Sequence, residues 1–340
     1  MADRHGRRPG RSGIRRVGAA LSAVLACAAL GACSGVQNGA VSADSGQEYP
    51  SGPVELIVGA SAGGSTDLLA RKVAEVLEGP LGATVTVLNK PGANGAVAAG
   101  ELMNSAPDGQ QFMLTSGSLM TITPHFVSPD EALSVDDVQL VTGVGREDYV
   151  LVANSAGGFA SIADIVAAGR TINYGTSGVG TGGQLSQRLL FDRLGIQSAD
   201  VPFEGGAPAV TALLGSQVDV ASVQVLEAMP HIQSGAFVPI ATFGEQRSPF
   251  LPDTPTATEQ GHDVVVDQSR FVWVPKGTPE ATVAKLAEAL RTTFADPGYQ
   301  DFIAQSYITA DETDAATTAA NLQADRERYG AAIKAAGITP

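Results

Sequence analysis

Short apolar runs of strand length alternate along the chain with longer segments in which apolar residues recur at helical spacing. The strand-like runs cover residues 54–58, 84–88, 111–115, 150–153, 172–174, 218–222, 238–242 and 271–274. Helical spacing covers residues 67–77, 184–194, 208–214, 279–294 and 315–336. At the start of 279–294, Thr278 suits the N-cap and Pro279 suits the first helical position. This alternation predicts an α/β fold with largely parallel sheets.

Two of these strand–helix units carry similar glycine-rich loops. The first loop spans residues 59–66 and the second spans residues 175–183, and each leads from a strand into a helix. In the second loop, Thr181 and Gln184 have the spacing of a capping box. Each loop brings the N–H groups of a helix start to the carboxyl end of a strand, where open α/β sheets bind ligands. Helix starts attract anions, so two such loops facing each other across a cleft predict a site for a small anion.

The beginning of the chain predicts export. A segment rich in arginine precedes the uncharged run 17–32, which ends in small residues before Cys33. This order is typical of a secretory signal, and the run is shorter than the roughly 20 residues of a membrane-spanning helix. Cys33 resembles the acylated cysteine of a lipobox, with Cys27 as a weaker second candidate, and Sec and twin-arginine export both stay open. We expect a signal peptide over residues 1–32 and a lipid-anchored flexible tether over 33–47, holding an exported protein on the outer face of the cytoplasmic membrane.

Charge and cysteine content narrow the function. No cysteine follows position 33, so the exported part has no disulfide, no thiolate nucleophile and no cysteine metal site. The net charge is −14, and loss of the signal takes 21 basic residues to 15 and 35 acidic residues to 34, a net charge of −19. Such a surface repels nucleic acid, so we expect no nucleic-acid partner. Any anion site must therefore be a local feature.

Two motifs in the loops raise enzymatic alternatives. Residues 59–63 match G-x-S-x-G, which would make Ser61 the nucleophile of an exported serine hydrolase. The motif stands on the first strand of the exported part, whereas that fold builds several strands before its nucleophile, and His231 and His262 have no diagnostic acid nearby. Residues 178–183 match the dinucleotide motif G-x-G-x-x-G, but a lone match is weak in a chain with 40 glycines. We therefore favour a binding protein over an enzyme.

The order and spacing of short motifs resemble the Bug-type receptors of tripartite tricarboxylate transporters. The motifs are Gly63-Gly64-Ser65-Thr66-Asp67, Asn89-Lys90-Pro91-Gly92-Ala93-Asn94-Gly95, Ala106-Pro107-Asp108-Gly109, Asn173-Tyr174-Gly175-Thr176-Ser177-Gly178, Val201-Pro202-Phe203, Leu251-Pro252-Asp253-Thr254-Pro255-Thr256 and Gly277-Thr278-Pro279. This resemblance implies a two-lobed periplasmic-binding-protein fold of type II, or Venus flytrap, with a mixed, mostly parallel sheet in each lobe. We expect residues 48–150 and 244–340 in lobe 1 and residues 151–243 in lobe 2, with a hinge near Ala153 and Thr242.

The same resemblance implies a receptor that closes on a small organic mono- or dicarboxylate and presents it to a membrane permease. It implies no catalysis, no cofactor and no metal ion, and we expect a monomer. Glu204 replaces a basic residue that is common in the family. Its carboxylate suits either a ligand ammonium, which keeps an amino acid open as the ligand, or a solvated surface. A sensor or scaffold with the same fold also stays open.

The predicted ligand-binding residues come from the two loops, from a third family segment after the strand 111–115 and from two departures from the family pattern. They are Ala60, Ser61, Gly63, Gly64, Ser65, Thr66, Asp67, Ser116, Gly117, Ser118, Thr176, Ser177, Gly178, Thr181, Glu204 and Arg270. Arg270 suits either a bidentate clamp on a carboxylate or a surface ion pair. We expect Asp67 to stabilise its helix start more than to contact ligand. Gln184, Val223 and Gln224 depart from the family pattern as well, which leaves the identity of the ligand open.

Overall fold

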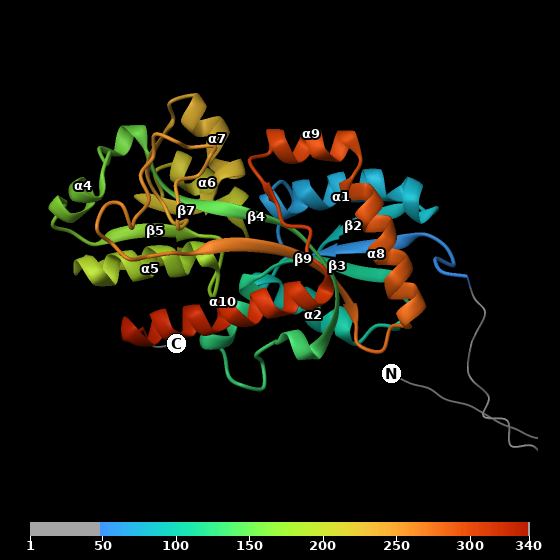
Figure 1. Ribbon diagram of the computed structural model, residues 1–340. Coiled ribbons are helices and arrows are strands. Elements are labelled where there is room, and N and C mark those ends of the chain that lie inside the picture. The colour runs from blue at the N-terminus through green and yellow to red at the C-terminus, as the bar shows by residue number, and fades with distance from the viewer. Residues whose placement is uncertain (1–47, 339–340) are drawn as a thin grey trace, which may run out of the picture. The chain divides into compact units, whose positions relative to one another are not determined.

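The computed structural model describes residues 48–338, and Figure 1 shows their helices and strands. The expected signal peptide, the lipidated Cys33 and the tether lie outside the described residues, so they stay predictions. Within residues 48–338, no helix combines the length and the apolar character needed to cross a membrane.

A ten-stranded mixed sheet is the framework, in the order β2-β1-β3-β9-β4-β7-β5-β6, and β8 and β10 also pair with β4. The strands are β1 (Val54–Val58), β2 (Val85–Asn89), β3 (Gln111–Ser116), β4 (Val138–Asn154), β5 (Ile172–Thr176), β6 (Ser198–Pro202), β7 (Val220–Gln224), β8 (Phe237–Thr242), β9 (Asp267–Pro275) and β10 (Thr309–Ala310). β1 runs parallel to β2 and β3, and β5 runs parallel to β6 and β7. Each half of the sheet therefore has a parallel core.

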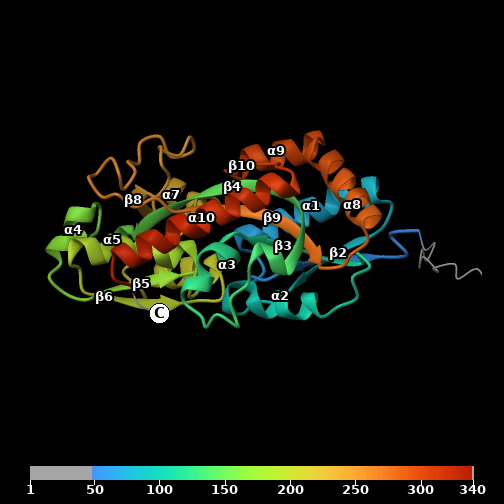
Figure 2. The same ribbon diagram turned by 60° about the horizontal axis from the view of Figure 1, so that its bottom comes forward.

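The long strand β4 belongs to both halves. It pairs antiparallel with β9 as far as Asp148, opposite Asp267, and with β7 from Tyr149, opposite Gln224. Figure 2 shows β4 and β9 running between two groups of helices. The predicted α/β fold with two lobes is confirmed, and the lobes are joined by these antiparallel strands.

Helices cover both faces of each half of the sheet. They are α1 (Ser65–Leu81), α2 (Ala96–Met103), α3 (Ser118–Thr121), α4 (Ile162–Ala167), α5 (Gly182–Leu194), α6 (Gly206–Leu214), α7 (Val225–Gln233), α8 (Glu280–Phe294), α9 (Pro297–Gln305) and α10 (Ala315–Ala335). In the first half, α1, α8 and α9 share a core on one face, and α2, α3 and the beginning of α10 share a core on the other. In the second half, α6 and α7 pack on one face, and α4, α5 and the end of α10 pack on the other.

The apolar positions of α1 show how the sequence pattern becomes packing. Leu69, Val73 and Leu77 recur every four residues and are fully buried in the first core. Burial of each such side chain contributes about 1.5–3 kcal/mol. The helix ends at Gly82, whose left-handed backbone (φ 74°) lets its N–H reach the Glu78 carbonyl.

Most predicted elements are present, but some limits differ. The strand expected over 150–153 is only the end of β4, because the glycines and charged residues in its first part break the apolar pattern. The prediction that Thr278 caps α8 is wrong: the helix begins at Glu280, Pro279 takes the N-cap position, and the Thr278 hydroxyl donates to the Pro275 carbonyl.

The lobe limits and the hinge stay predictions. One relevant contact is that Ala257, Val264 and Val266 pack in the core shared by α4 and α5. This part of the segment after residue 243 is therefore buried together with the second half of the sheet.

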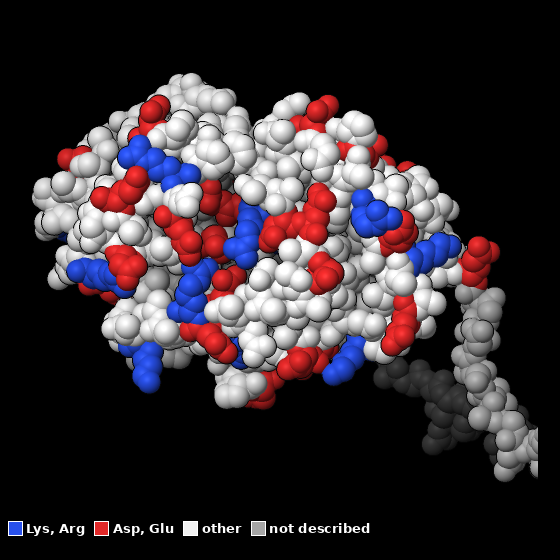
Figure 3. All heavy atoms as spheres, viewed as in Figure 1, with Lys and Arg blue, Asp and Glu red and all other residues white. Residues whose placement is uncertain are grey.

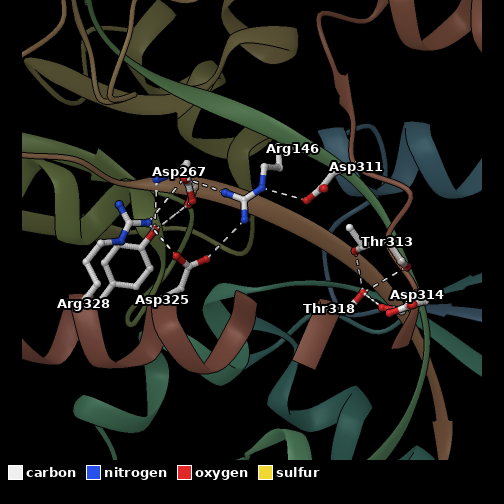
Figure 4. Close-up of polar contacts among 9 residues, drawn as sticks. Arg146, Asp267, Asp311, Thr313, Asp314, Thr318, Asp325 and Arg328 are labelled. Atoms are coloured by element: carbon white, nitrogen blue, oxygen red, sulfur yellow. Dashed lines mark hydrogen bonds and ion pairs between the residues drawn. The ribbon is translucent and has the colours of Figure 1, made fainter. Parts of the chain in front are cut away.

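An ion-pair network lies beside the point where β4 changes partner (Figure 4). Arg146 on β4 donates to Asp267 at 3.0 Å and to Asp311 at 2.9 Å, and it lies 3.8 Å from Asp325 of α10. Arg328 of α10 lies 2.9 Å from Asp325 and 3.6 Å from Asp267. The network ties β4, β9 and α10 together. On the face viewed in Figure 3, other basic side chains also lie beside acidic ones, and that face shows no basic patch.

Candidate ligand-binding site

A small polar cavity of about 50 Å³ lies where loops of the two lobes meet. Its walls come from the β1–α1, β5–α5 and β6–α6 loops, the segments after β2 and β3, the start of α7, and side chains of β4 and β9. The lining residues are Gly59, Ala60, Ser61, Gly64, Ser65, Thr66, Gly92, Asn94, Thr115, Ser116, Ser118, Tyr149, Ser177, Thr181, Glu204, Gly205, Gly206, Gln224, Glu227, Gln268 and Arg270. A cavity of this size holds a few water molecules, so a ligand larger than that requires the walls to move apart.

The start of α1 forms one wall. Its N-cap residue, Gly64, has no side chain that can accept from the first N–H groups of the helix. The Ser65 N–H donates instead to Glu227 Oε1, at 3.0 Å. A carboxylate from α7 in the second lobe thus takes the position that a capping side chain takes in other helices.

Asp67 stabilises the loop behind this wall and does not line the cavity. Its carboxylate accepts from the Gly63 N–H at 2.8 Å, from Asn89 Nδ2 at 2.9 Å and from Arg71 Nε at 3.0 Å. Burial alone would raise the pKa of Asp67, but the hydrogen bonds from Arg71, Gly63 and Asn89 outweigh burial and hold this pKa below its ordinary value.

The start of α5 forms the opposite wall. Thr181 caps the helix by accepting from the Gln184 N–H at 3.3 Å, as the spacing predicts. In a full capping box the Gln184 side chain would also accept from the N–H of the N-cap residue, Thr181. Here Gln184 Oε1 accepts instead from the Gly180 N–H, at 2.8 Å. Gln184 Nε2 donates to Asp200, whose carboxylate also accepts from the Thr176 hydroxyl at 3.2 Å. These contacts fix the shape of the second glycine-rich loop.

Each of the two predicted loops lines the cavity and is hydrogen-bonded to a segment of the other lobe. Asn94 Nδ2 in the first lobe donates to Ser118 Oγ at 2.9 Å and to the Gly180 carbonyl at 3.2 Å. The Ser61 N–H donates to the Glu204 carbonyl at 3.3 Å, and the Ser61 hydroxyl donates to the same oxygen. Backbone and hydroxyl groups of both lobes therefore face one cavity.

Arg270 on β9 brings a buried positive charge to this cavity. Its side chain is 1% exposed, and its Nη2 lies 2.8 Å from Glu147 Oε2 on β4. The Ser65 hydroxyl donates to the other Glu147 oxygen and accepts from Arg270 Nη2 at 3.3 Å. Arg270 Nε and Nη1 are buried and have no hydrogen-bond partner among the described residues. The ion pair considered from the sequence is therefore buried, not at the surface, and it leaves donors of the guanidinium unused.

Glu227 is the second buried carboxyl group of the site. Burial raises its pKa to about 7, and the nearby Glu147 charge raises it as well. The N–H groups of Ser65 and Gln224 and the charge of Arg270 act in the opposite direction without cancelling the effect of burial.

A chain of hydrogen bonds closes the remaining side. Gln224 Nε2 donates to Tyr149 Oη at 3.3 Å, and Tyr149 Oη donates to Gln268 Oε1 at 2.7 Å. Gln268 Nε2 donates to Ser116 Oγ, which lies 2.6 Å from Ser118 Oγ. The chain holds the amide and hydroxyl groups of this wall in fixed positions.

Most of the predicted ligand residues line the cavity, namely Ala60, Ser61, Gly64, Ser65, Thr66, Ser116, Ser118, Ser177, Thr181, Glu204 and Arg270. Gly63, Asp67, Gly117, Thr176 and Gly178 are not part of the lining. Contact of any of these residues with a ligand stays a prediction.

Sequence reasoning missed several lining side chains, of which Asn94, Tyr149, Glu227 and Gln268 make the contacts described above. One signal for Glu227 was present, because Gln224 and Glu227 have capping-box spacing directly after a strand, and the structure forms that box.

The geometry of Ser61 does not match a catalytic nucleophile. Its hydroxyl is engaged by the Glu204 carbonyl, and no histidine of residues 48–338 lines the cavity. His125 Nε2 lies 3.1 Å from the Arg326 carbonyl, and the His231 ring packs against Phe237. Within the same residues, no group of three or more His, Cys, Asp or Glu side chains is placed to hold a metal ion.

Comparison with known sequences gives a family match. A sequence profile described as "Tripartite tricarboxylate transporter family receptor" matches residues 69–338. A protein of Agrobacterium vitis, described as a UPF0065 protein in the TAR-I ttuE-ttuC' intergenic region, is 33% identical over 298 residues, which cover 85% of this chain and 86% of the relative.

Solved structures with the same fold extend this likeness. The periplasmic binding protein BugD is 29% identical with a TM-score of 0.81, and the match covers 86% of this chain and 99% of BugD. Two proteins of R. palustris are each 24% identical, one solved with adipate (TM-score 0.81, 86% of this chain and 100% of that one) and one with bound malate (TM-score 0.79, 84% and 100%). At that identity, the two R. palustris proteins show a shared fold.

Proposed function

The chain belongs to the tripartite tricarboxylate transporter receptor family, and from this premise we propose that it binds a small organic mono- or dicarboxylate in the cavity between its lobes. It is a solute-binding protein and not an enzyme. The protein works outside the cytoplasm as a monomer and delivers its ligand to a membrane permease of the same transporter type. The adipate and malate of the two R. palustris structures suggest the size and chemistry of candidate ligands.

The observation that supports this proposal most directly is the pair of unused donors on Arg270. Arg270 lines the cavity, and its Nε and Nη1 are buried and have no partner among residues 48–338. An unpartnered buried donor costs about 1–3 kcal/mol. A ligand carboxylate that accepts from one of these donors removes the cost of that donor; Nε–H and Nη1–H lie on different edges of the guanidinium, because Nη2, which lies between them, is taken by Glu147 and Ser65.

Hydroxyl and backbone groups supply the remaining interactions. A charge-assisted hydrogen bond contributes about 1.5–3 kcal/mol, so one bond from Arg270 supplies only part of the binding free energy. Micromolar affinity requires about 8 kcal/mol. Hydrogen bonds from the serine and threonine hydroxyls that line both walls can supply the rest of this free energy.

A thermal-shift screen of the purified protein tests the proposal. The panel contains malate, adipate, short monocarboxylates and amino acids. A ligand at 100 times its Kd adds about 2.7 kcal/mol to the free energy of unfolding, which raises Tm measurably. A panel without any carboxylate that raises Tm would contradict the proposal.

Arg270→Lys then tests the site with the best ligand of the panel. Lysine keeps the positive charge beside Glu147 but lacks the second and third guanidinium nitrogens that would donate to the ligand, so we expect Kd to rise about 10- to 150-fold, the equivalent of one lost charge-assisted bond. Arg170→Lys is the matched control, because Arg170 is half-exposed and pairs with Asp219 away from the cavity. Equal Kd values for the wild-type protein and Arg270→Lys would mean that the ligand does not contact Arg270.

A further inference from the structure

The cavity already contains a carboxyl group of the protein in a position that suits an anion. Glu227 Oε1 accepts from the Ser65 N–H at the start of α1, and Oε2 accepts from the Gln224 N–H at the start of α7, at 3.4 Å. Gly206, the first residue of α6, lies so close that a Cβ there would be 1.9 Å from Oε2. The carboxyl group is thus wedged between the starts of three helices, where N–H groups and helix dipoles favour negative charge.

Few charges face Glu227 from the elements packed against it. β9 contributes Arg270, but this guanidinium is paired with Glu147 of β4, and β4 also contributes the Tyr149 hydroxyl. The β6–α6 loop contributes the exposed Glu204. The starts of α1, α6 and α7 contribute only uncharged groups at the contact. Arg270 therefore faces two buried carboxyl groups, and a bound ligand carboxylate would be a third.

Glu227 has little freedom to leave when a ligand enters. Its side chain is anchored by the capping box of its own helix, and Gly206 packs against it from α6. Withdrawal would break the bonds to Ser65 and Gln224 together. Once the two lobes have closed on a ligand and these bonds are formed, the negative charge is therefore neutralised where it stands.

We propose that the site takes up a ligand carboxylate together with one proton, and that Glu227 holds this proton in the complex. The inference rests on the proposed function and adds a proton to it. The proton comes from solvent and binds one Glu227 oxygen. The other oxygen continues to accept from the Ser65 N–H, and the new hydroxyl donates to the ligand carboxylate. The pKa of about 7 for Glu227 in the absence of ligand means that this proton is available near neutral pH.

The pH dependence follows from the sign of this linkage. A ligand carboxylate raises the pKa of Glu227 further, because like charges disfavour the ionised form. Below about pH 7, Glu227 already carries its proton, and Kd changes little until the ligand itself is protonated. Above about pH 7, binding must take up the proton, so Kd rises towards tenfold for each pH unit.

Isothermal titration calorimetry of the wild-type protein measures the proton directly. Titrations with malate and adipate, and with any other carboxylate that raises Tm in the screen, are run at pH 6 in phosphate and in Bis-Tris, and at pH 8 in phosphate and in Tris. These buffers differ in ionisation enthalpy, so the difference in heat counts protons. We expect an uptake close to one proton at pH 8 and close to zero at pH 6.

Two variants test whether Glu227 is the residue that takes up the proton. Glu227→Gln imitates the protonated acid, so we expect it to bind at pH 8 about as tightly as the wild-type protein binds at pH 6, with a flat pH profile. Glu204→Gln removes an exposed carboxylate of the same lining; whatever its effect on Kd itself, the slope of log Kd against pH should equal that of the wild-type protein. A melting curve for each variant verifies that it is folded.

The outcomes separate the inference from the proposed function. Binding without proton uptake at pH 8 overturns the inference and leaves the carboxylate receptor standing. Binding only of amino acids, lost in Glu227→Gln, also overturns it, because Glu227 would then be the partner of an ammonium group. No binding of any carboxylate at either pH overturns both.

Discussion

The close packing of the Glu227 carboxyl group against Gly206 predicts that substitutions at the two residues have strongly coupled effects on the free energy of unfolding. Gly206 is the first residue of α6, so its backbone is compatible with alanine. In a helix, replacement of Gly by Ala stabilises by about 0.5–1 kcal/mol. Here the new Cβ would lie 1.9 Å from Glu227 Oε2 and 2.3 Å from the carboxyl carbon. The carboxyl group must then move and lose its bond to the Ser65 N–H.

A double-mutant cycle gives the magnitude. In the wild-type background, Gly206→Ala should destabilise by about 1–3 kcal/mol, the usual cost of overpacking a filled site. In a Glu227→Ala background the obstacle is gone, and the same change should stabilise by about 0.5–1 kcal/mol. The coupling energy is therefore about 1.5–4 kcal/mol.

Urea unfolding of the four proteins measures this coupling. Gly79→Ala is the matched control, since Gly79 lies in α1 and a Cβ there meets nothing within 4 Å. It should have the same small effect in both backgrounds. If Gly206→Ala and Glu227→Ala add within about 0.5 kcal/mol, as independent sites do, the carboxyl group is not held between α1 and α6 and the reasoning is refuted.

Two further predictions concern α1. Asp67→Asn should lower the free energy of unfolding by about 1–2 kcal/mol at pH 7, because it weakens the charge-assisted bonds to Arg71 and the Gly63 N–H. Since the folded-state pKa of Asp67 is lowered, this contribution is present above the unfolded-state value of about 4 and is lost as pH falls through the folded-state pKa; urea unfolding at pH 7 and pH 3 measures the change, and an equal difference at both pH values would contradict it. Leu77→Ala should cost about 2–5 kcal/mol in the same assay. Leu68→Ala, at a position 38% exposed on the same helix, should cost less than about 0.5 kcal/mol, and similar losses at both positions would contradict the packing of α1.

The parts of the fold that follow from local patterns could be predicted from the sequence. β1 lies in an apolar run of strand length, and α10 lies in a segment with helical spacing. The sequence predicted the limits of both to within a residue or two. The first part of β4 could not be foreseen. There, Gly143, Gly145 and the charged residues after them interrupt the apolar alternation, and pairing with β9 compensates for it. Tertiary pairing decided the structure of that segment, and local propensity did not.

The candidate site divides in the same way. The glycine-rich loops and their position at strand ends are local features, and Ser61 and Ser65, which the sequence assigns to these loops, line the cavity. Arg270 pairs with Glu147, which lies 123 residues earlier in the chain. The Ser65 N–H donates to Glu227, which lies in the other lobe. Such pairs depend on the arrangement of β4, β9 and α7, and no single-sequence pattern reports them.

The charge of the site explains how an acidic protein can hold an anion. The chain has a net charge of −14, but charges at the surface are screened over about 8 Å at physiological ionic strength. Affinity is therefore decided by the groups at the cavity. Arg270 brings a full positive charge and two unused donors, Glu147 balances that charge, and the helix starts add partial positive charge. Glu227 is left as the group whose charge sets the sign of the local balance, so its protonation turns a cavity that repels a carboxylate into one that accepts it.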